Sequence, residues 1–168
     1  LKNKKMKATL VFPKKGTAVL LAKKVRKIGA GKWNGFGGKP EPKDLSIRHT
    51  ACRELFQESG KGMVATPEDL QPKALIDFFL FQNTSNEPDW SVAIYLVENF
   101  SGEIKDSDEM VGATWFPIDS IPYDDMLPAD EDFIPKIFEE DTFKGKVRFN
   151  EDLTAVVESE YTNTKIDI

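Results

Sequence analysis

The sequence predicts a mixed α and β fold, of the α/β or α+β class, in which a mixed sheet packs against two helices. Strand-like runs rich in β-branched and aromatic residues recur along the chain, most clearly at residues 74–81 and 91–97. Residues 44–60 and 131–140 have the apolar spacing typical of helices. No repeat, low-complexity tract or linker divides the 168 residues, so a single domain over residues 1–168 is expected.

The N-terminal part is expected to form two strands followed by an irregular loop. Residues 7–12 (KATLVF) and 18–23 (AVLLAK) are strand-like, and residues 13–16 (PKKG) between them are typical of a turn. Residues 29–38 contain five glycines, which favours a loop over a regular element.

The helix predicted over residues 44–60 has recognisable boundaries. Asp44 or Ser46 is suited to the N-cap, and Gly60 or Gly62 to the C-terminal stop. One apolar arc along this helix is expected to face the core. Its members are Ala51, Cys52, Leu55, Phe56 and Ser59.

The remaining elements are expected to complete the sheet and to add a second helix. Residues 74–81 and 91–97 are predicted to pair through a loop at residues 82–89. Further along the chain the predicted elements are a strand at 113–117, a helix at 131–140, and a closing hairpin of residues 146–149 and 153–157.

Charge and composition exclude several classes of protein. A formal net charge of −5 argues against a broad nucleic-acid-binding surface, so no nucleic acid polymer is expected as a partner. No apolar run is long enough to span a membrane, and the basic first residues lack the features of a signal peptide. The single cysteine fits a reducing cytoplasm, and a monomer is expected.

Two carboxylates on the predicted helix indicate a metal site. Glu54 and Glu58 are four residues apart, so both side chains lie on one helix face. Their mutual repulsion is relieved if a cation lies between them, and Mg²⁺ favours such oxygen ligands together with waters and substrate phosphates. Taken alone, the pair could equally be a solvated charge pair; the glycines at 37 and 38 upstream favour phosphate chemistry.

The residues around this pair resemble a known family motif. The pattern Gly38-x14-Arg53-Glu54-Leu55-x-Gln57-Glu58-x-Gly60 resembles the Nudix box. The resemblance covers nearly the whole chain and extends to the subgroup that hydrolyses oxidised purine nucleoside triphosphates (8-oxo-dGTP diphosphatase-like). The segments that carry it are WNGFGGK at 33–39, SDEM at 107–110, WFPID at 115–119, IPYDDM at 121–126 and FKG at 143–145.

Four departures separate this chain from the family pattern. The stretch between Gly38 and Arg53 is one residue longer, so the first glutamate of the box falls on or beside Leu45, with Asp44 the nearest acid. Gln57 replaces the first of two adjacent glutamates. Lys61 replaces an apolar residue. The base-recognition segment of the subgroup, Trp-Pro-Asp-Asp, is LPAD at residues 127–130, without its tryptophan and one aspartate.

The resemblance implies roles for the box residues. It implies an α/β/α sandwich with a mixed central sheet and a Mg²⁺ or Mn²⁺ cofactor. The implied metal ligands are Gly38, Glu54, Gln57, Glu58 and Glu109. Arg53 is implied to orient the catalytic glutamate, although a surface salt bridge is the simpler alternative. Glu58 or Glu109 is implied to act as the base, and Glu109 could instead be plain solvated surface.

The resemblance and side-chain chemistry together suggest a substrate-binding set. Its members are Lys24, Asn34, Gly37, Lys39, Phe78, Trp90, Leu127 and Asp130. Lysines suit phosphates, Asn34 and Asp130 suit the edge of a base, and aromatic rings suit its faces. Trp90 is a candidate to compensate for the tryptophan lost at Leu127. The alternatives are a turn role for Asn34, an N-cap role for Asp130 and core packing for the aromatic residues.

These expectations lead to a metal-dependent pyrophosphohydrolase. It would cleave a small-molecule nucleotide, a purine nucleoside triphosphate such as 8-oxo-dGTP, to the monophosphate and pyrophosphate, and so cleanse the nucleotide pool. Two alternatives stay open. One is a Nudix hydrolase of another nucleoside diphosphate derivative, a sugar or a dinucleotide; the other is a nucleotide sensor without hydrolysis.

Overall fold

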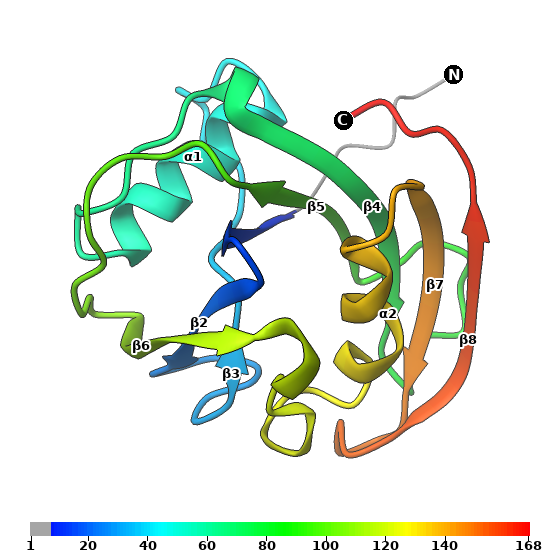
Figure 1. The fold of residues 1–168 in the computed structure, drawn as a ribbon. Coiled ribbons are helices and arrows are strands. Elements are labelled where there is room, and N and C mark those ends of the chain that lie inside the picture. The colour runs from blue at the N-terminus through cyan, green and yellow to red at the C-terminus, as the bar shows by residue number, and fades with distance from the viewer. Residues whose placement is uncertain (1–7) are drawn as a thin grey trace.

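The computed structural model of the chain describes residues 8–168 (Figure 1). The strands are β1 (Ala8–Lys15), β2 (Ala18–Lys24), β3 (Trp33–Asn34), β4 (Leu70–Phe79), β5 (Trp90–Val97), β6 (Met110–Pro117), β7 (Phe143–Phe149) and β8 (Val156–Asn163). The α-helices are α1 (Ile47–Glu58) and α2 (Asp130–Ile137). No helix within the described range is long and apolar enough to cross a membrane.

The strands form a mixed sheet in the order β3-β2-β1-β5-β4-β7-β8, with β6 paired to β2. β1 with β5 and β4 with β7 run parallel, and the other pairs run antiparallel. β1 and β2 are paired only beside their connecting turn, at Lys14 with Val19 and Lys15 with Ala18. Beyond the turn, residues Phe36 to Gly38 pair with β1 instead, which separates β2 from β1.

The sheet has a hydrophobic core on each face. Alternate residues of one strand enter different cores: Phe12 of β1 packs with α2, whereas Val11 packs with α1. The two helices therefore cover opposite faces, as Figure 1 shows. This arrangement confirms the predicted sandwich with a mixed central sheet.

Helix α1 begins and ends largely as its sequence indicates. Ser46 is the N-cap, and its hydroxyl accepts a hydrogen bond from the backbone N–H of His49. The helix ends at Glu58, and Gly60 follows with a φ of 68°, which suits a residue without a Cβ. The predicted membership of the apolar arc was partly wrong: Ala51 and Leu55 are fully buried, whereas Phe56 is 38% exposed.

Other boundaries differ from the sequence prediction for local reasons. The loop predicted over 29–38 contains the two-residue strand β3, because Trp33 and Asn34 pair with β2. The predicted turn at 13–16 is shorter, since β1 continues to Lys15. The last strand begins at Val156 rather than 153, because Leu153 has a φ of 62° within the turn. Residue 7, the first of the predicted N-terminal strand, lies outside the described range.

Candidate active site

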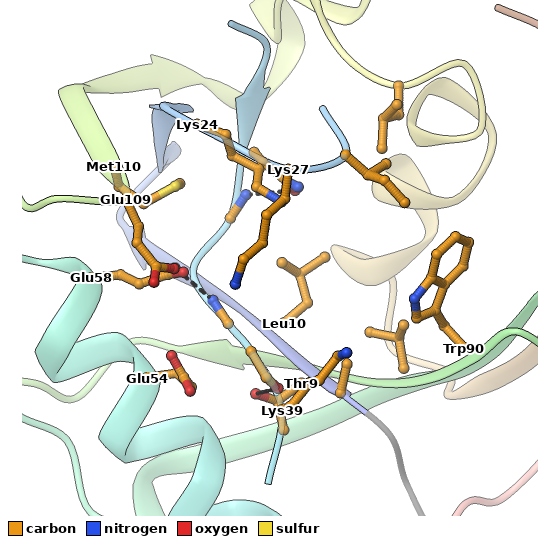
Figure 2. Close-up of a pocket in the computed structure, with 18 of the residues that line it drawn as sticks. Thr9, Leu10, Lys24, Lys27, Lys39, Glu54, Glu58, Trp90, Glu109 and Met110 are labelled. Carbon is orange, nitrogen blue, oxygen red and sulfur yellow. Dashed lines mark hydrogen bonds between the residues drawn. The ribbon is translucent and has the colours of Figure 1, made fainter. Parts of the chain in front are cut away.

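A cavity of about 750 Å³ lies where β1 and β2 separate, bordered by both helices. Figure 2 shows its two ends: the carboxylates of Glu54, Glu58 and Glu109 lie on one side, and the indole of Trp90 lies on the other. All of the residues predicted to bind metal or substrate line this cavity. Arg53, which was predicted to orient a glutamate, is not on its wall.

Glu58 is a buried carboxyl group at the metal-ligand end of the cavity. Its side chain is 5% exposed, and its Oε2 accepts a hydrogen bond of 2.9 Å from the backbone N–H of Gly37 (Figure 2). Burial raises the pKa of Glu58 to about 8, and the neighbouring Glu109 and Glu54 add to the shift. The last turn of α1 thus holds an acid that prefers to keep a proton when no cation is near it.

The glycine pair at residues 37 and 38 lets the backbone approach α1. A Cβ at Gly37 would overlap the backbone oxygen of Thr9, and a Cβ at Gly38 would lie 2.5 Å from the carboxyl carbon of Glu54. The Gly38 carbonyl accepts a hydrogen bond from the Thr9 backbone N–H, 2.8 Å away. Space therefore requires glycine at residue 37, whereas a side chain at residue 38 would displace the carboxyl group of Glu54, which approaches the main chain directly.

Arg53 lies behind the carboxylates and fixes their surroundings. Its Nε and Nη2 donate to both carboxylate oxygens of Asp44, at 2.9 and 2.8 Å. Its Nη1 donates to Glu54 Oε1 at 2.7 Å and to Gln57 Oε1 at 3.2 Å. The guanidinium holds the pKa of Asp44 far below its usual range. Arg53 is thus placed to orient Glu54 and Gln57 from behind the cavity wall.

Asp44 stands in for the first glutamate of the box, which the longer spacing of this chain had left without a matching residue. It forms the two-point ion pair with Arg53, and it accepts a further hydrogen bond of 2.9 Å from the Thr50 hydroxyl. Leu45 beside it, where the family pattern placed the first glutamate of the box, is 86% exposed. The sequence offered Asp44 only as the nearest acid or an N-cap, and its pairing with Arg53 could not be read from spacing.

Glu109 approaches Glu58 from the loop before β6. The proximity of the two carboxyl groups raises the pKa of Glu58 further and lowers that of Glu109. Arg26 is the larger cause for Glu109: its Nη2 donates to Oε1 at 3.0 Å. Glu109 is therefore held ionised while Glu58 keeps the proton. Arg26 was not foreseen, because its partner is more than 80 residues away in sequence.

The donor chemistry of this end fits a hard divalent cation. The predicted ligands offer only oxygen atoms: three carboxylates, the Gly38 carbonyl and the Gln57 amide oxygen. A cation at this end would be ligated by the carboxylate oxygens of Glu58 and Glu109 and would displace the proton that Glu58 otherwise keeps. Within residues 8–168, no three acidic, histidine or cysteine side chains form a ready-made metal cluster, so the fit rests on the donor set.

The opposite end of the cavity is an aromatic slot with a buried acid. Asp130 is 6% exposed, and its Oδ2 has no hydrogen-bond partner among the described residues. Burial raises the pKa of Asp130 to about 8. The N-cap of α2 is Ala129, so Asp130 does not have the capping role considered as its alternative. A neutral carboxyl group is thus free to face a ligand.

Aromatic and apolar side chains surround that acid. Phe78 stacks on Phe149 with ring centroids 5.8 Å apart, and its edge meets Phe133. Leu127 lies against the loop at Gly29, and Trp90 lies at the far side of the cavity. Phe133 and Phe149 were missed as site residues, because only the fold brings them beside Phe78.

Asn34, on β3, lines the cavity. Its Oδ1 accepts a hydrogen bond of 2.8 Å from the Gly35 backbone N–H, which is the turn role considered for it. Its amide nitrogen has no partner among residues 8–168, and a residue that lines the cavity can turn this group toward a ligand. The turn role and a contact with a ligand are therefore compatible, one for each end of the amide.

Comparisons with known proteins agree with this geometry. A family model described as the NUDIX domain matches residues 5–137. A zebrafish (Danio rerio) protein named oxidized purine nucleoside triphosphate hydrolase is 38% identical over 141 residues, covering 84% of this chain and 85% of the relative. A mouse (Mus musculus) protein of the same name is 33% identical over 143 residues, covering 85% and 86%.

Solved structures share the fold. A MutT protein from Bacillus halodurans superimposes with a TM-score of 0.75 at 22% identity, covering 92% of this chain and 95% of that one. A bifunctional NMN adenylyltransferase/ADP ribose pyrophosphatase from Francisella tularensis, complexed with AMP and a manganese ion, superimposes with a TM-score of 0.60 at 20% identity, covering 83% and 43%. At these identities the likeness concerns the fold alone.

Proposed function

This chain belongs to the Nudix family of hydrolases, and on that premise we propose that it is a metal-dependent pyrophosphohydrolase of oxidised purine nucleoside triphosphates. The products are the nucleoside monophosphate and pyrophosphate, so the protein removes damaged nucleotides from the pool. The names of the zebrafish and mouse relatives support this substrate class.

One observation supports the proposal above the others. A single cavity joins an oxygen-rich end, with Glu54, Glu58 and Glu109, to an aromatic slot that ends at Asp130, whose carboxyl oxygen Oδ2 has no hydrogen-bond partner among the described residues. A nucleotide has the same two-part chemistry, since a charged phosphate chain is linked to a flat base with polar edges. The lysines at 24 and 39 on the cavity wall balance the acids at the phosphate end.

The chain's own residues have separate tasks in the reaction. Glu54, Glu58, Glu109, the Gly38 carbonyl and Gln57 would hold Mg²⁺ or Mn²⁺, which supplies charge neutralisation at the phosphates and activation of water. Glu58 or Glu109 accepts the proton of the attacking water. Arg53 orients Glu54 through a direct hydrogen bond of 2.7 Å. Positioning of the phosphate chain along α1 provides most of the remaining rate.

Recognition of the base is assigned to the aromatic end. A protonated Asp130 donates a hydrogen bond to a carbonyl or ring nitrogen of the purine, and the amide nitrogen of Asn34 donates a second. Trp90 and Phe78 flank the base, with Leu127 in place of a larger stacking ring. The same proposal includes a monomer that acts in the cytoplasm, where free nucleotides occur.

A substrate panel tests this function. Initial rates are measured with Mg²⁺ for 8-oxo-dGTP, dGTP, ADP-ribose, a nucleoside diphosphate sugar and a dinucleoside polyphosphate. We expect the highest kcat/KM for 8-oxo-dGTP, with pyrophosphate as product. A higher value for the sugar or dinucleotide substrates would contradict the substrate class. Binding without metal-dependent turnover in the wild type would indicate a sensor, and Glu54→Ala is the inactive control that excludes a contaminating hydrolase.

A further inference from the structure

Lys27 is an unusual residue in the loop between β2 and β3. Its backbone has a φ of 66°, in the left-handed region that side chains with a Cβ rarely adopt. Gly29 and Gly31 of the same loop have positive φ angles too, and glycine is the residue such positions favour. A lysine in this conformation is a local strain of the kind that clusters at functional sites.

The side chain of Lys27 extends into the active-site cavity. Figure 2 shows it running from the loop into the open space, with its amino group toward Glu58 rather than toward Trp90. The Lys27 carbonyl accepts a hydrogen bond of 3.1 Å from the Ala30 backbone N–H, but no hydrogen bond or ion pair joins the Lys27 side chain to any of residues 8–168. Its charge is nevertheless felt at Glu109, whose pKa is lowered chiefly by Arg26 and further by Lys27. The ammonium group is therefore an unpaired cation at the phosphate end.

The neighbouring basic residue in the loop is already engaged. Arg26 forms an ion pair with Glu109 at 3.0 Å. These two consecutive residues of the loop therefore differ: Arg26 is paired with a carboxylate of the protein, whereas the side chain of Lys27 extends into the cavity. An ammonium on a flexible stem suits the oxygens of a phosphate chain, which it can follow as a point charge.

We propose that Lys27 binds the β- and γ-phosphates of the substrate and makes the site prefer a nucleoside triphosphate to its monophosphate product. This inference rests on the proposed function. With the base against Asp130 and the cleaved bond beside Glu58, the Lys27 amino group points toward that bond, and we place the phosphates beyond it within reach of the flexible lysine stem. A monophosphate lacks those groups, so Lys27 contributes little to holding the product.

Two substitutions separate charge from folding. Lys27→Gln removes the charge and keeps the length of the stem. Lys27→Gly also removes the side chain, but it relaxes the backbone at φ 66°, so its melting temperature should equal or exceed that of the wild type. Lys27→Arg should restore binding. Lys15→Gln is the matched control, because Lys15 is exposed at the end of β1 and does not line the cavity.

The measurement is equilibrium binding by calorimetry, with Mg²⁺ and again with EDTA. The probes are the non-hydrolysable α,β-imido analogue of 8-oxo-dGTP and the monophosphate 8-oxo-dGMP. We expect Lys27→Gln and Lys27→Gly to weaken the analogue about tenfold, as expected for loss of one charged hydrogen bond. Binding of the monophosphate should change less than twofold, and Lys15→Gln should change neither.

The outcomes distinguish this inference from the proposed function. If the wild type prefers the triphosphate analogue and the Lys27 variants keep the same preference, the role of Lys27 is refuted while the function stands. An equal loss for both probes also refutes it, because the effect would then be general electrostatics or misfolding. If the wild type binds neither probe, the proposed function itself fails.

Discussion

Arg53 is the residue that connects the acids of the site to the rest of the fold. Its guanidinium reaches Asp44, Glu54, Gln57 and the carbonyl of Lys39 at once. Its side chain is 12% exposed and that of Asp44 is 6% exposed, so the pair is well shielded from water. Removing one partner of such a pair leaves the other charge without compensation.

Asp44→Asn should therefore weaken both stability and turnover. We expect a loss of about 2–4 kcal/mol in the free energy of unfolding, from breaking a largely buried ion pair. We expect kcat to fall at least about tenfold, since Arg53 is no longer held by the Asp44 carboxylate and orients Glu54 less well. Urea unfolding and steady-state kinetics measure the two effects. Leu45→Ala is the control and should behave as the wild type. A similar loss of stability and turnover in Leu45→Ala would contradict the role assigned to the ion pair between Asp44 and Arg53.

Asp130 provides a pH test at the residue scale. Its pKa is raised to about 8 in the folded protein from its ordinary value of 3.8, so between these values the folded state binds more protons than the unfolded state. Its contribution to stability is therefore greatest below pH 3.8 and declines as the pH rises toward 8. Asp130→Asn, which cannot ionise, should gain in stability relative to the wild type between pH 5 and pH 9. Urea unfolding at both pH values checks this, and a constant difference would show that Asp130 is not buried as a neutral acid.

At the scale of elements, α1 and the glycine segment act as one unit. The helix provides Glu54 and Glu58, and residues 36–38 are held in place by their pairing with β1. The helix itself was predictable from its caps and apolar spacing. The contact between helix and glycine segment was predicted only through the box pattern, because nothing in the local spacing shows how closely two backbones approach.

The two glycines should differ in what an added methyl group costs. At Gly37 the Cβ meets the backbone of Thr9, which cannot move without disturbing β1. Gly37→Ala should therefore lower the free energy of unfolding by about 2 kcal/mol or more. At Gly38 the Cβ meets only the end of the Glu54 side chain. Gly38→Ala should cost less than about 1 kcal/mol but displace Glu54 and reduce kcat. Melting curves and kinetics compare them, and equal destabilisation would contradict this reading.

Strands were the most predictable elements, and short or edge strands the least. The long apolar runs of β4 and β5 needed no tertiary information. In contrast, β3 has two residues and exists because it pairs with β2, and β8 is a largely exposed edge strand whose start depends on the turn before it. Phe56 on α1 was misplaced because its position in the apolar arc did not reveal that no element covers it.

At the scale of the whole molecule, the net charge of −5 conceals a local balance. The acids of the cavity lie among Lys24, Arg26, Lys27 and Lys39. The chain's net charge argued against a nucleic acid partner but could not reveal this arrangement. We propose, as the sequence predicts, that the chain is a single domain; one sheet from β1 to β8 with a core on each face supports this.

The candidate site was largely predictable, and the missing parts have a common cause. Residues of the box and the glycine loop were named because they are close in sequence. Arg26, Phe133 and Phe149 were not, since each meets its partner only after the sheet forms. The burial of Asp130, which makes it a neutral acid, likewise depends on α2 packing against the sheet.

The most direct test of the central claim is the rate of pyrophosphate release from 8-oxo-dGTP by Glu58→Gln, measured beside the wild type in Mg²⁺. Glutamine keeps the size of the side chain and removes its charge, so the melting temperature should change little. We expect turnover to fall by about 10²–10⁴-fold, the usual contribution of a positioned acid or base. Turnover within about threefold of the wild type, well short of that contribution, would contradict the assignment of Glu58 to the reaction.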